Sequence, residues 1–485
     1  MLTATIHLDP KRHRGPIDRR IFGTFLEHMG RAVYEGAYDP ASPRSDEHGF
    51  RTDVLTALSE MGASIVRYPG GNFVSTYNWK NGIGPKDKRP RRPDYAWKSV
   101  ETNQFGTDDF IAWCRKGGFE PMMTVNLGTR GAEDACEWLE YCNLPRGYQY
   151  SDLRPQEEPY AVQMWCLGNE MDGPWQAGHV PAHEYAMRAQ QAAKIMKGLD
   201  ERVQTVAAGS SGRFMSTYLD WDREVLEFGW DDFDFIAAHR YSQNNAQNTA
   251  EFLAEGVEIE RVITDYRSLV GYIRGRRRSN RHVYLSFDEW NVWYKNMETD
   301  GKWSEAPHLI EEVYNVEDAL VVAQYLNAFI RNADFVRAAC LAQAVNIIGP
   351  LLTQRDGLLK QSIYYAFQMI AQSVGSHALE ALIESPQYPA GRHGEVPVLD
   401  GSASFDPKTG ETTLVLVNRS QTEGMSVQVP GYVAASATRL HHSDPKLDNT
   451  WDEPTRVVPH DASAEALIVP PLSITTVRLL PESDA

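Results

Sequence analysis

Short apolar segments alternate with longer segments of helical periodicity over residues 21–342. A short, continuous apolar run is typical of a strand that is buried on both faces. The pattern predicts eight such strands: Ile21–Phe25, Ser64–Tyr68, Pro121–Val125, Val162–Leu167, Gln204–Ala208, Phe235–His239, His282–Phe287 and Ala338–Ala342. Between them it predicts the helices Arg51–Met61, Thr107–Lys116, Ala132–Tyr141, Ala182–Leu199, Ile259–Arg274 and Val316–Asn332.

This alternation predicts an α/β protein with a parallel sheet, because a parallel connection requires a crossover and a helix commonly supplies it. Eight strand–helix units indicate a (β/α)₈ TIM barrel with enlarged loops. The competing architecture is a doubly wound open sheet. That fold normally carries a glycine-rich phosphate turn after its first strand, and IFGTFLEHMG has no such turn. The barrel is therefore the favoured interpretation.

The pattern changes near residue 375. From Ala378 onward, short alternating segments are separated by turn residues, and no long helix is evident. This is typical of an antiparallel β-sandwich. Residues 3–9, TATIHLD, alternate in the same way before the first barrel strand. We therefore predict a catalytic barrel at 18–375 and a jelly-roll-like sandwich built from 1–17 and 376–485.

Composition narrows the class of protein. A formal net charge of −17 argues against a nucleic-acid partner, and we interpret the basic runs Lys86–Arg92 and Arg274–Arg281 as solvated surface. No apolar run reaches the roughly 18 residues of a membrane span. The N-terminal MLTATIHLDPKRHRG lacks the apolar core of a signal peptide, and the five cysteines form no CxxC pair. We expect a cytoplasmic protein without a membrane partner.

One pair of histidines has the spacing of helix-borne metal ligands. His179 and His183 are four residues apart, but Met187 occupies the position of the second histidine in an HExxH motif. We interpret both as structural residues. The expectation is an activity that needs no metal and no cofactor.

Polar residues follow nearly every predicted barrel strand. Active sites of TIM barrels lie at the C-terminal ends of the strands, so these residues are expected to form one hydrogen-bonding cup. Each alone is also explained as a cap of its strand. The set comprises Glu27, His28, Asn72, Asn126, Asn169, Glu170, His239, Arg240, Tyr241, Asp288, Glu289, Gln343 and Asn346.

Two carboxylates in this set indicate glycoside hydrolysis. Glu170 follows the fourth strand and Glu289 the seventh. Cleavage of a glycosidic bond requires one carboxylic acid to protonate the leaving oxygen and one carboxylate on the other side of the sugar. A helix start is the structural alternative for Glu170, and it leaves Glu289 unexplained. Strand alternation predicts that Asp288 points away from Glu289 and has a structural hydrogen-bonding role.

The same segments carry a resemblance to a known family. IFGTFLEHMGRAVYEG, RYPGGNFVSTYNWKNGIGP, WCLGNEMDGPWQAGH, AAHRYS, LSFDEWNVWY and LAQAVNIIGPL resemble the motifs of the family 51 glycoside hydrolases. That family consists mainly of α-L-arabinofuranosidases. The resemblance spans about residues 20–360, with the motifs in the same order.

The resemblance implies a retaining mechanism with Glu170 as acid/base and Glu289 as nucleophile. It also implies further roles for the other rim residues, an arabinofuranosyl oligosaccharide as substrate and a homo-oligomer, a hexamer in many members. In these roles Glu27, Asn72, Asn169 and Gln343 bind the sugar hydroxyls, Tyr241 bonds the nucleophile, His239 lies beside the acid/base, Trp97 and Trp293 form aromatic walls, and Arg67 supports the nucleophile.

Two rival functions stay open at this point. One is a different retaining glycosidase of the same clan, such as a β-xylosidase or an endoglucanase. The other is a catalytically silent sugar-binding protein, although such a protein would be expected to lack one of the two carboxylates. The residues leave the linkage preference open among 1,2, 1,3 and 1,5, because loop shape beyond the sugar-binding cup determines it.

Overall fold

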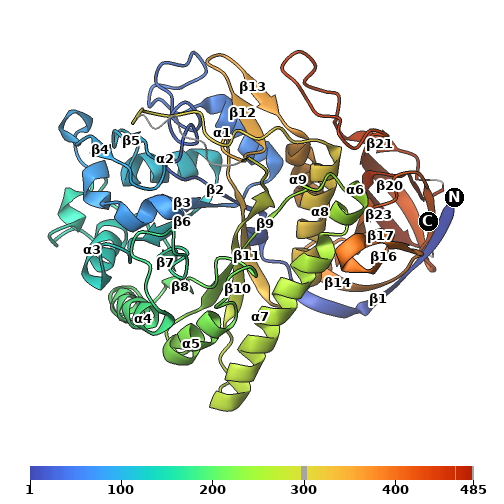
Figure 1. Cartoon of the computed structure of the whole chain (residues 1–485), viewed down its shortest axis with the longest axis horizontal. Coiled ribbons are helices and arrows are strands. Elements are labelled where there is room, and N and C mark those ends of the chain that lie inside the picture. Colours follow the sequence, from blue (N-terminus) through green and yellow to red (C-terminus); the bar gives the residue numbers. More distant parts are fainter. Residues whose placement is uncertain (296–302, 465, 483–485) are drawn as a thin grey trace.

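Two bodies make up the protein in this computed structural model, which describes residues 1–295, 303–464 and 466–482. Figure 1 shows a barrel surrounded by helices and, beside it, a β domain that contains both ends of the chain. The α/β TIM barrel and the C-terminal β-sandwich expected from the sequence are confirmed.

The barrel is a closed ring of parallel strands. All eight strands predicted from the sequence are present, and closure excludes the open doubly wound sheet. In chain order they are β2 (Gly23–Phe25), β3 (Ile65–Tyr68), β6 (Glu120–Val125), β7 (Met164–Leu167), β8 (Gln204–Ala207), β9 (Phe235–Ser242), β10 (Tyr284–Val292) and β11 (Val336–Ala342).

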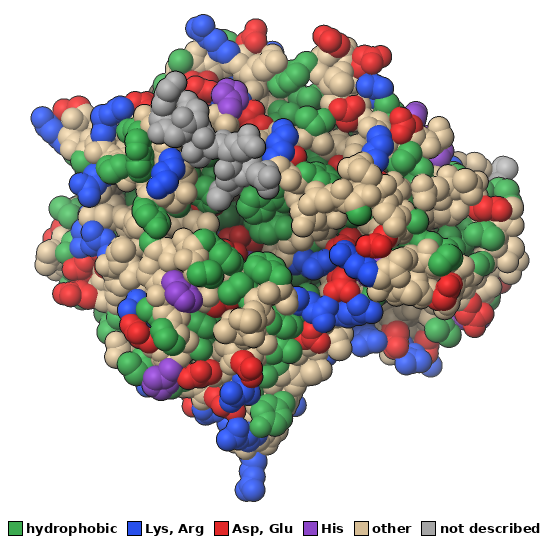
Figure 2. All heavy atoms as spheres, viewed as in Figure 1, with side chains coloured by type: hydrophobic (Ala, Val, Ile, Leu, Met, Phe, Trp, Pro, Cys, Tyr) green, Lys and Arg blue, Asp and Glu red, His purple; other side chains and the backbone are tan. Residues whose placement is uncertain are grey.

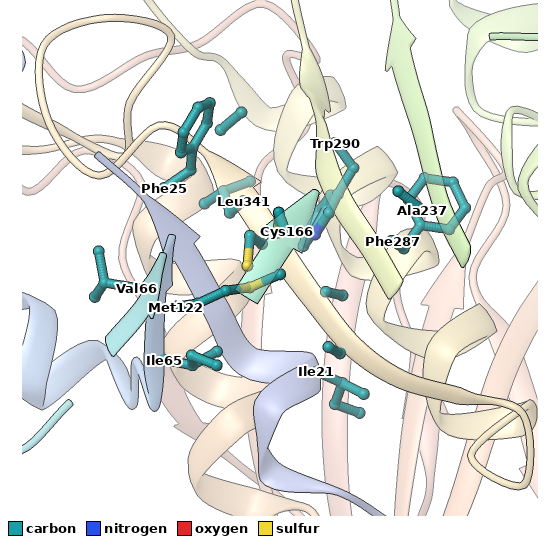
Figure 3. Close-up of a cluster of buried hydrophobic side chains, with 14 of the residues drawn as sticks. Ile21, Phe25, Ile65, Val66, Met122, Cys166, Ala237, Phe287, Trp290 and Leu341 are labelled. Atoms are coloured by element: carbon teal, nitrogen blue, oxygen red, sulfur yellow. The ribbon is translucent and has the colours of Figure 1, made fainter. Parts of the chain in front are cut away.

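Apolar side chains fill the barrel, so it is a packed core and not a pore. Figure 3 shows Ile65, Met122, Cys166 and Leu341, from four different strands, among the buried side chains of this cluster. All five cysteines are buried and unpaired. Burial raises the pKa of the Cys166 thiol to about 12, so this thiol is uncharged at neutral pH.

Helices surround the barrel: α1 (Thr52–Met61), α2 (Thr107–Gly117), α3 (Ala132–Asn143), α4 (Ala182–Leu199), α5 (Asp220–Gly229), α6 (Thr249–Phe252), α7 (Gly256–Arg277), α8 (Val316–Arg331) and α9 (Ser362–Ser373). The six predicted helices are present, whereas α5, α6 and α9 were not predicted. In α2, hydrogen bonding at the N-terminus and a glycine at the C-terminus explain where the helix begins and ends. Asp109 accepts a hydrogen bond from the N–H of Gly106 at the N-terminus, and Gly118 ends the helix at φ 75°.

The second domain is one nine-stranded sheet with its own apolar core. Its spatial order is β21 (His460–Ala462), β20 (Tyr432–His441), β23 (Ser473–Pro481), β18 (Thr412–Asn418), β17 (Leu399–Phe405), β14 (His377–Glu384), β1 (Leu2–Pro16), β19 (Met425–Gln428) and β22 (Ile468–Val469).

The N-terminal strand β1 lies inside this sheet. It pairs antiparallel with β14 and parallel with β19, so the expectation of a purely antiparallel sheet is wrong at one pair. Hairpin loops enforce antiparallel pairing only between strands that they connect. Because β1 and β19 are far apart in the chain, no hairpin restricts their direction.

Helix α8 lies between the two bodies (Figure 1). The sequence shows one apolar stripe, at Ala319, Val322, Ala323, Leu326 and Ile330, but the structure buries every residue from Val316 to Ile330. One buried polar residue, Asn327, bonds to the sheet domain: its side-chain amide donates to Asp400 at 2.8 Å and accepts from Ser402 at 2.7 Å. Paired polar groups make this burial possible.

Short elements complete the fold. Three two-stranded sheets are formed by β4 (Arg92–Pro93) with β5 (Val100–Glu101), β12 (Leu351–Thr353) with β13 (Leu358–Lys360), and β15 (Gln387–Pro389) with β16 (Glu395–Pro397). The 3-10 helices are η1 (Arg19–Phe22), η2 (Asn72–Thr76), η3 (Trp79–Gly82), η4 (Lys86–Lys88), η5 (Ser151–Leu153) and η6 (Gly391–His393). None of the helices in the described part of the chain combines the length and apolar character needed to cross a membrane.

The position of β1 predicts that the sheet domain depends on the N-terminus for its stability. Ile6 is fully buried in the core of this domain, so Ile6→Ala is expected to lower the free energy of unfolding by about 2–5 kcal/mol. The neighbouring His7 is exposed, and His7→Ala serves as the matched control. Urea denaturation measures both. Equal midpoints for the two variants would show that β1 contributes little to the domain.

Candidate active site

Two glutamates meet at the C-terminal end of the barrel. Glu170 follows β7, in a loop where its own φ is 45°, and Glu289 lies within β10. A left-handed conformation is uncommon for a residue with a side chain and is often found at functional sites. One carboxylate oxygen of each glutamate lies within 4.8 Å of the other and of a ring nitrogen of His239.

A β-bulge in β10 decides how its carboxylates point. Ser286 pairs with Ala237 and Glu289 with His239, so three steps along β10 correspond to two along β9. As a result Asp288 and Glu289, although consecutive, both reach His239 and Arg67. The expectation that Asp288 points away from Glu289 is therefore wrong, because the bulge interrupts the alternation on which it was based.

Arg67, from β3, is buried beneath the two glutamates. Its guanidinium donates to Glu289 Oε1 and to Asn169 Oδ1, each at 2.7 Å, and its Nε lies 3.7 Å from Asp288 Oδ2. Burial acts to lower the pKa of Arg67, but the charges of Asp288 and Glu289 outweigh it and raise the pKa well above its usual value. A permanent cation therefore holds Glu289 in place.

His239 lies between three carboxylates. Its Nδ1 is 3.0 Å from Glu170 Oε1 and 3.5 Å from Glu289 Oε2, and its Nε2 is 3.1 Å from Asp288 Oδ1. Burial acts to lower its pKa, but these carboxylates raise it well above the usual histidine value. The ring is therefore an imidazolium at neutral pH. Tyr241 completes this group by donating to Glu289 Oε2 at 3.0 Å.

Glu27 is in a different electrostatic state. It accepts hydrogen bonds from the N–H of Phe73 and from Trp97 Nε1, each at 2.9 Å, and Gln343 Nε2 lies 3.4 Å from its second oxygen. Burial, aided by the charge of Glu289, raises the pKa of Glu27 to about 8. Its carboxyl group is therefore largely protonated at neutral pH and is able to donate a hydrogen bond to a ligand.

Backbone approaches this cup closely at Gly71. A Cβ at Gly71 would lie 2.9 Å from Glu289 Oε1 and 3.4 Å from Glu27 Oε2, so any larger residue would displace a carboxylate. The next residue, Asn72, accepts a long hydrogen bond of 3.5 Å from Asn169 Nδ2. The PGGN segment thus forms the edge of the cup between Glu27 and Glu289.

The structure brings together the residues to which specific roles were assigned, but not the whole predicted cup. A cavity of about 690 Å³ is lined by Glu27, Asn72, Trp97, Glu170, His239, Tyr241, Glu289, Trp293 and Gln343. Arg67 and Asn169 bond to these residues from just beneath. His28, Asn126 and Asn346 do not line the cavity; they bond to Tyr68, to the carbonyl oxygen of Tyr77 and to the carbonyl oxygen of Arg31, respectively. Figure 2 shows a hollow on this face with hydrophobic side chains around it. Such a cavity, with convergent polar groups and shifted pKa values, is typical of an active site.

Other residues of the cavity were not predicted. Trp175 donates from Nε1 to Glu170 Oε2 at 2.9 Å, and its position five residues after Glu170 was a signal that the sequence offered. Arg213 and Phe214, from the loop after β8, and Arg392, from η6 of the sheet domain, also line the cavity. No local pattern marks these three, because only the packing of distant segments places them there.

Known proteins resemble this chain over nearly its whole length. The α-L-arabinofuranosidase 1 domain matches residues 57–257, and the α-L-arabinofuranosidase C-terminal domain matches residues 288–473. An intracellular exo-α-(1→5)-L-arabinofuranosidase of Halalkalibacterium halodurans is 42% identical over 96% of this chain and 95% of its own. A family 51 α-L-arabinofuranosidase structure from Bifidobacterium longum has a TM-score of 0.94 and 35% identity, covering 99% of this chain and 100% of its own.

The chain belongs to the family 51 α-L-arabinofuranosidases. It is a glycoside hydrolase. An exo-α-(1→6)-L-arabinofuranosidase of Bifidobacterium longum is 40% identical over 96% of this chain and 95% of its own. The α-L-arabinofuranosidase structure from Thermotoga maritima in complex with arabinose has a TM-score of 0.88 and 34% identity, covering 99% of this chain and 100% of its own.

The enzyme's metal independence stays a prediction. Among the described residues, the group whose spacing suits a metal ion is Glu170, His239 and Glu289. His179 lies 3.2 Å from the carbonyl oxygen of Met171 and His183 lies 3.6 Å from Glu224, so the two histidines have different partners.

The geometry around His239 predicts the effect of removing Asp288. Asp288→Asn takes away one of the carboxylates that stabilise the imidazolium, so the pKa of His239 should fall by about one unit or more, equivalent to about 1.4 kcal/mol. The ring would then lose its proton at a lower pH than in the wild type. Nitrogen-15 NMR of histidine-labelled enzyme over a pH series measures this directly.

Asp172→Asn is the matched control for that experiment. Asp172 is also a buried carboxylate in the loop after β7, but it accepts from the N–H of Ser211 at 3.1 Å instead of contacting His239. An unchanged His239 titration in Asp288→Asn, or an equal shift in both variants, would contradict a specific role for Asp288.

Proposed function

We propose that the enzyme is an exo-acting, retaining α-L-arabinofuranosidase. It removes terminal non-reducing α-L-arabinofuranosyl residues from arabino-oligosaccharides, arabinan or arabinoxylan fragments by double displacement. The observation that carries this proposal is the separation of at most 4.8 Å between oxygens of Glu170 and Glu289. Carboxyl groups about 5–5.5 Å apart are typical of retaining enzymes, whereas inverting enzymes need more room for a water molecule.

In the first step, Glu289 attacks the anomeric carbon as the glycosidic bond breaks. Arg67 and Tyr241 hold the attacking carboxylate through its two oxygens, at 2.7 and 3.0 Å. Glu170 donates its proton to the departing glycosidic oxygen, and a covalent glycosyl–enzyme ester forms. His239 and Trp175 hold Glu170 through its two oxygens, at 3.0 and 2.9 Å, and so fix the position of the acid.

In the second step, Glu170 acts as a base. It takes a proton from water, whose oxygen attacks the anomeric carbon and breaks the ester bond to Glu289. Glu170 is thereby protonated again and Glu289 is released as a carboxylate. Two displacements at one carbon restore the original anomeric configuration.

The other cup residues bind the sugar in this proposal. Glu27, Asn72, Asn169 and Gln343 bond to the hydroxyl groups of the arabinofuranose, and Trp97 and Trp293 form its aromatic walls. Two observations support this: Trp97 is held by its hydrogen bond to Glu27, and Trp293 packs edge-on against Tyr241 with ring centroids 5.0 Å apart. Rigid, held side chains are well suited to position a substrate.

We propose α-1,5-linked arabino-oligosaccharides as the main substrate and the cytoplasm as the location. The names of relatives from Halalkalibacterium halodurans and Bacillus subtilis, at 42% and 40% identity, support both points. The relative named for the 1→6 linkage makes that linkage the natural comparison in an assay. The homo-oligomer, a hexamer in many members of the family, stays a prediction.

The configuration of the first product tests the mechanism. Direct attack by Glu289 requires release of α-L-arabinofuranose, which proton NMR detects in the first minutes before the anomers equilibrate. Initial release of the β anomer would overturn the proposal, because it would place water between the carboxylates and make Glu289 a base.

Leaving-group dependence separates the roles of the two glutamates. Glu289→Ala should reduce hydrolysis of every substrate to trace rates. Glu170→Ala should lose most activity on oligosaccharides but still cleave a dinitrophenyl arabinofuranoside to the covalent ester, because that leaving group needs little protonation. Mass spectrometry of the intact protein should then show the accumulated ester.

Azide gives a second measurement of the same assignment. It attacks without needing a base, so it should speed turnover of Glu170→Ala and yield an azide of retained configuration. With Glu289→Ala, any azide product should be inverted. Circular dichroism establishes that both variants are folded. Exchanged behaviour of the two variants, or equal loss of Glu170→Ala activity on good and poor leaving groups, would refute the assignment.

A further inference from the structure

The cavity extends well beyond the two glutamates. Its volume of about 690 Å³ is in the range of pockets that enclose ligands of several rings, roughly 300–1,000 Å³. Its lining continues along the loop after β8, at Ser211–Phe214, and reaches Arg392 in the sheet domain. Figure 2 shows Lys and Arg side chains on the side of the hollow that faces this domain. Neither the cup residues nor the proposed mechanism uses this outer part.

One wall of the outer part is aromatic. Trp175 is tied to Glu170 by its hydrogen bond, and its ring centroid lies 6.2 Å from that of Phe214. Phe214 is 75% exposed, although burying a side chain of this size stabilises a protein by about 1.5–3 kcal/mol. An exposed aromatic ring at the mouth of a sugar cleft offers an apolar surface for a second ring to stack on.

The lining of the outer part also carries two guanidinium groups held by acidic residues. Arg213 pairs with Glu258, and Arg392 pairs with Glu255. Glu255 is fully buried and also accepts hydrogen bonds from Arg240 and, at 3.0 Å, from Ser242 Oγ at the end of β9. Burial acts to raise the pKa of Glu255, but its basic partners outweigh burial and lower it to about 2. Glu255 therefore stays ionised and holds Arg392 at the cavity edge, while Glu258 and Asp265 hold Arg213.

The arginines around this part of the cavity are matched in number by carboxylates, which points to a neutral ligand. Each of these arginines pairs with a carboxylate, in the pairs Arg213–Glu258, Arg213–Asp265, Arg240–Glu255, Arg261–Glu258, Arg392–Glu251 and Arg392–Glu255. The side chains of Arg392 and Arg213 remain 58% and 36% exposed, so they keep N–H groups available for hydroxyl oxygens. Fixed N–H donors with paired charges, in a cavity that also holds an aromatic ring, suit an uncharged sugar better than an anion.

We propose that Arg213, Phe214 and Arg392 form a subsite for the second sugar of the leaving group, so that the sheet domain contributes directly to substrate recognition. The first leaving-group sugar lies beside Glu170 and Trp175, and the next one extends to the outer walls. This inference rests on the proposed function, which supplies the direction of the oligosaccharide. The ligand is a neutral arabino-oligosaccharide of at least three units.

Comparison of two substrates tests this subsite. α-1,5-Arabinobiose has one leaving-group sugar and α-1,5-arabinotriose has two, so the ratio of their kcat/KM values isolates the second. Phe214→Ala and Arg392→Met should each lower the triose-to-biose ratio by about tenfold, equivalent to about 1.4 kcal/mol. Phe214 is so exposed that its replacement leaves the core of the protein intact.

Arg478→Met is the matched control. Arg478 is on β23 of the same domain, its side chain is 48% exposed and it pairs with Glu411, but it does not line the cavity. Its triose-to-biose ratio should equal that of the wild type. Equal losses on both substrates in Phe214→Ala and Arg392→Met, or no change in either, would overturn the subsite. A wild-type enzyme that cleaves neither substrate would instead refute the proposed function.

Discussion

Two cations, Arg67 and His239, are buried at the floor of the cavity together with the carboxylates of Asp288 and Glu289. Charges out of water are stable only when paired with good geometry, and removing one partner of a buried pair costs about 3–5 kcal/mol. The pairs join β3, β9 and β10, so these strands must keep their register and the bulge in β10 must keep its place. The rest of the active site depends on this arrangement.

The same physics gives the carboxylic acids of the cup different states. Asp288 has two buried cations beside it, and although burial acts to raise its pKa, Arg67 and His239 lower it. Burial raises the pKa of Glu27 to about 8, because the hydrogen bonds from Phe73 and Trp97 offset burial only in part and the charge of Glu289 adds to it. Two carboxylic acids thus have opposite states, a permanent anion at Asp288 and a largely protonated hydrogen-bond donor at Glu27, because their surroundings differ.

The sheet domain is joined to this chemistry by a second set of buried pairs. Helix α8 is covered by the barrel on one face and bonded to the sheet through Asn327 and Arg331 on the other. Glu255 connects Arg392 of the sheet domain to Arg240, which stands between His239 and Tyr241 on β9. These contacts join the two domains beside the cavity, where an active site needs side chains held in fixed positions.

The sequence by itself determined the eight barrel strands, the change to β structure near residue 375 and the position of Glu170 and Glu289 at strand ends, whereas Arg67, Trp97 and Trp293 were predicted only through the family resemblance. The strands and the change of structure follow from local periodicity, and the two glutamates follow from their place directly after a strand. Both signals lie in residues that are neighbours in the chain. The tertiary structure alone decided the orientation of Asp288, the parallel pairing of β1 and the place of Phe214 and Arg392 at the cavity. The bulge in β10, the pairing of β1 with β19 and the cavity lining all depend on contacts between segments that are distant in the chain. Local sequence patterns do not encode such contacts.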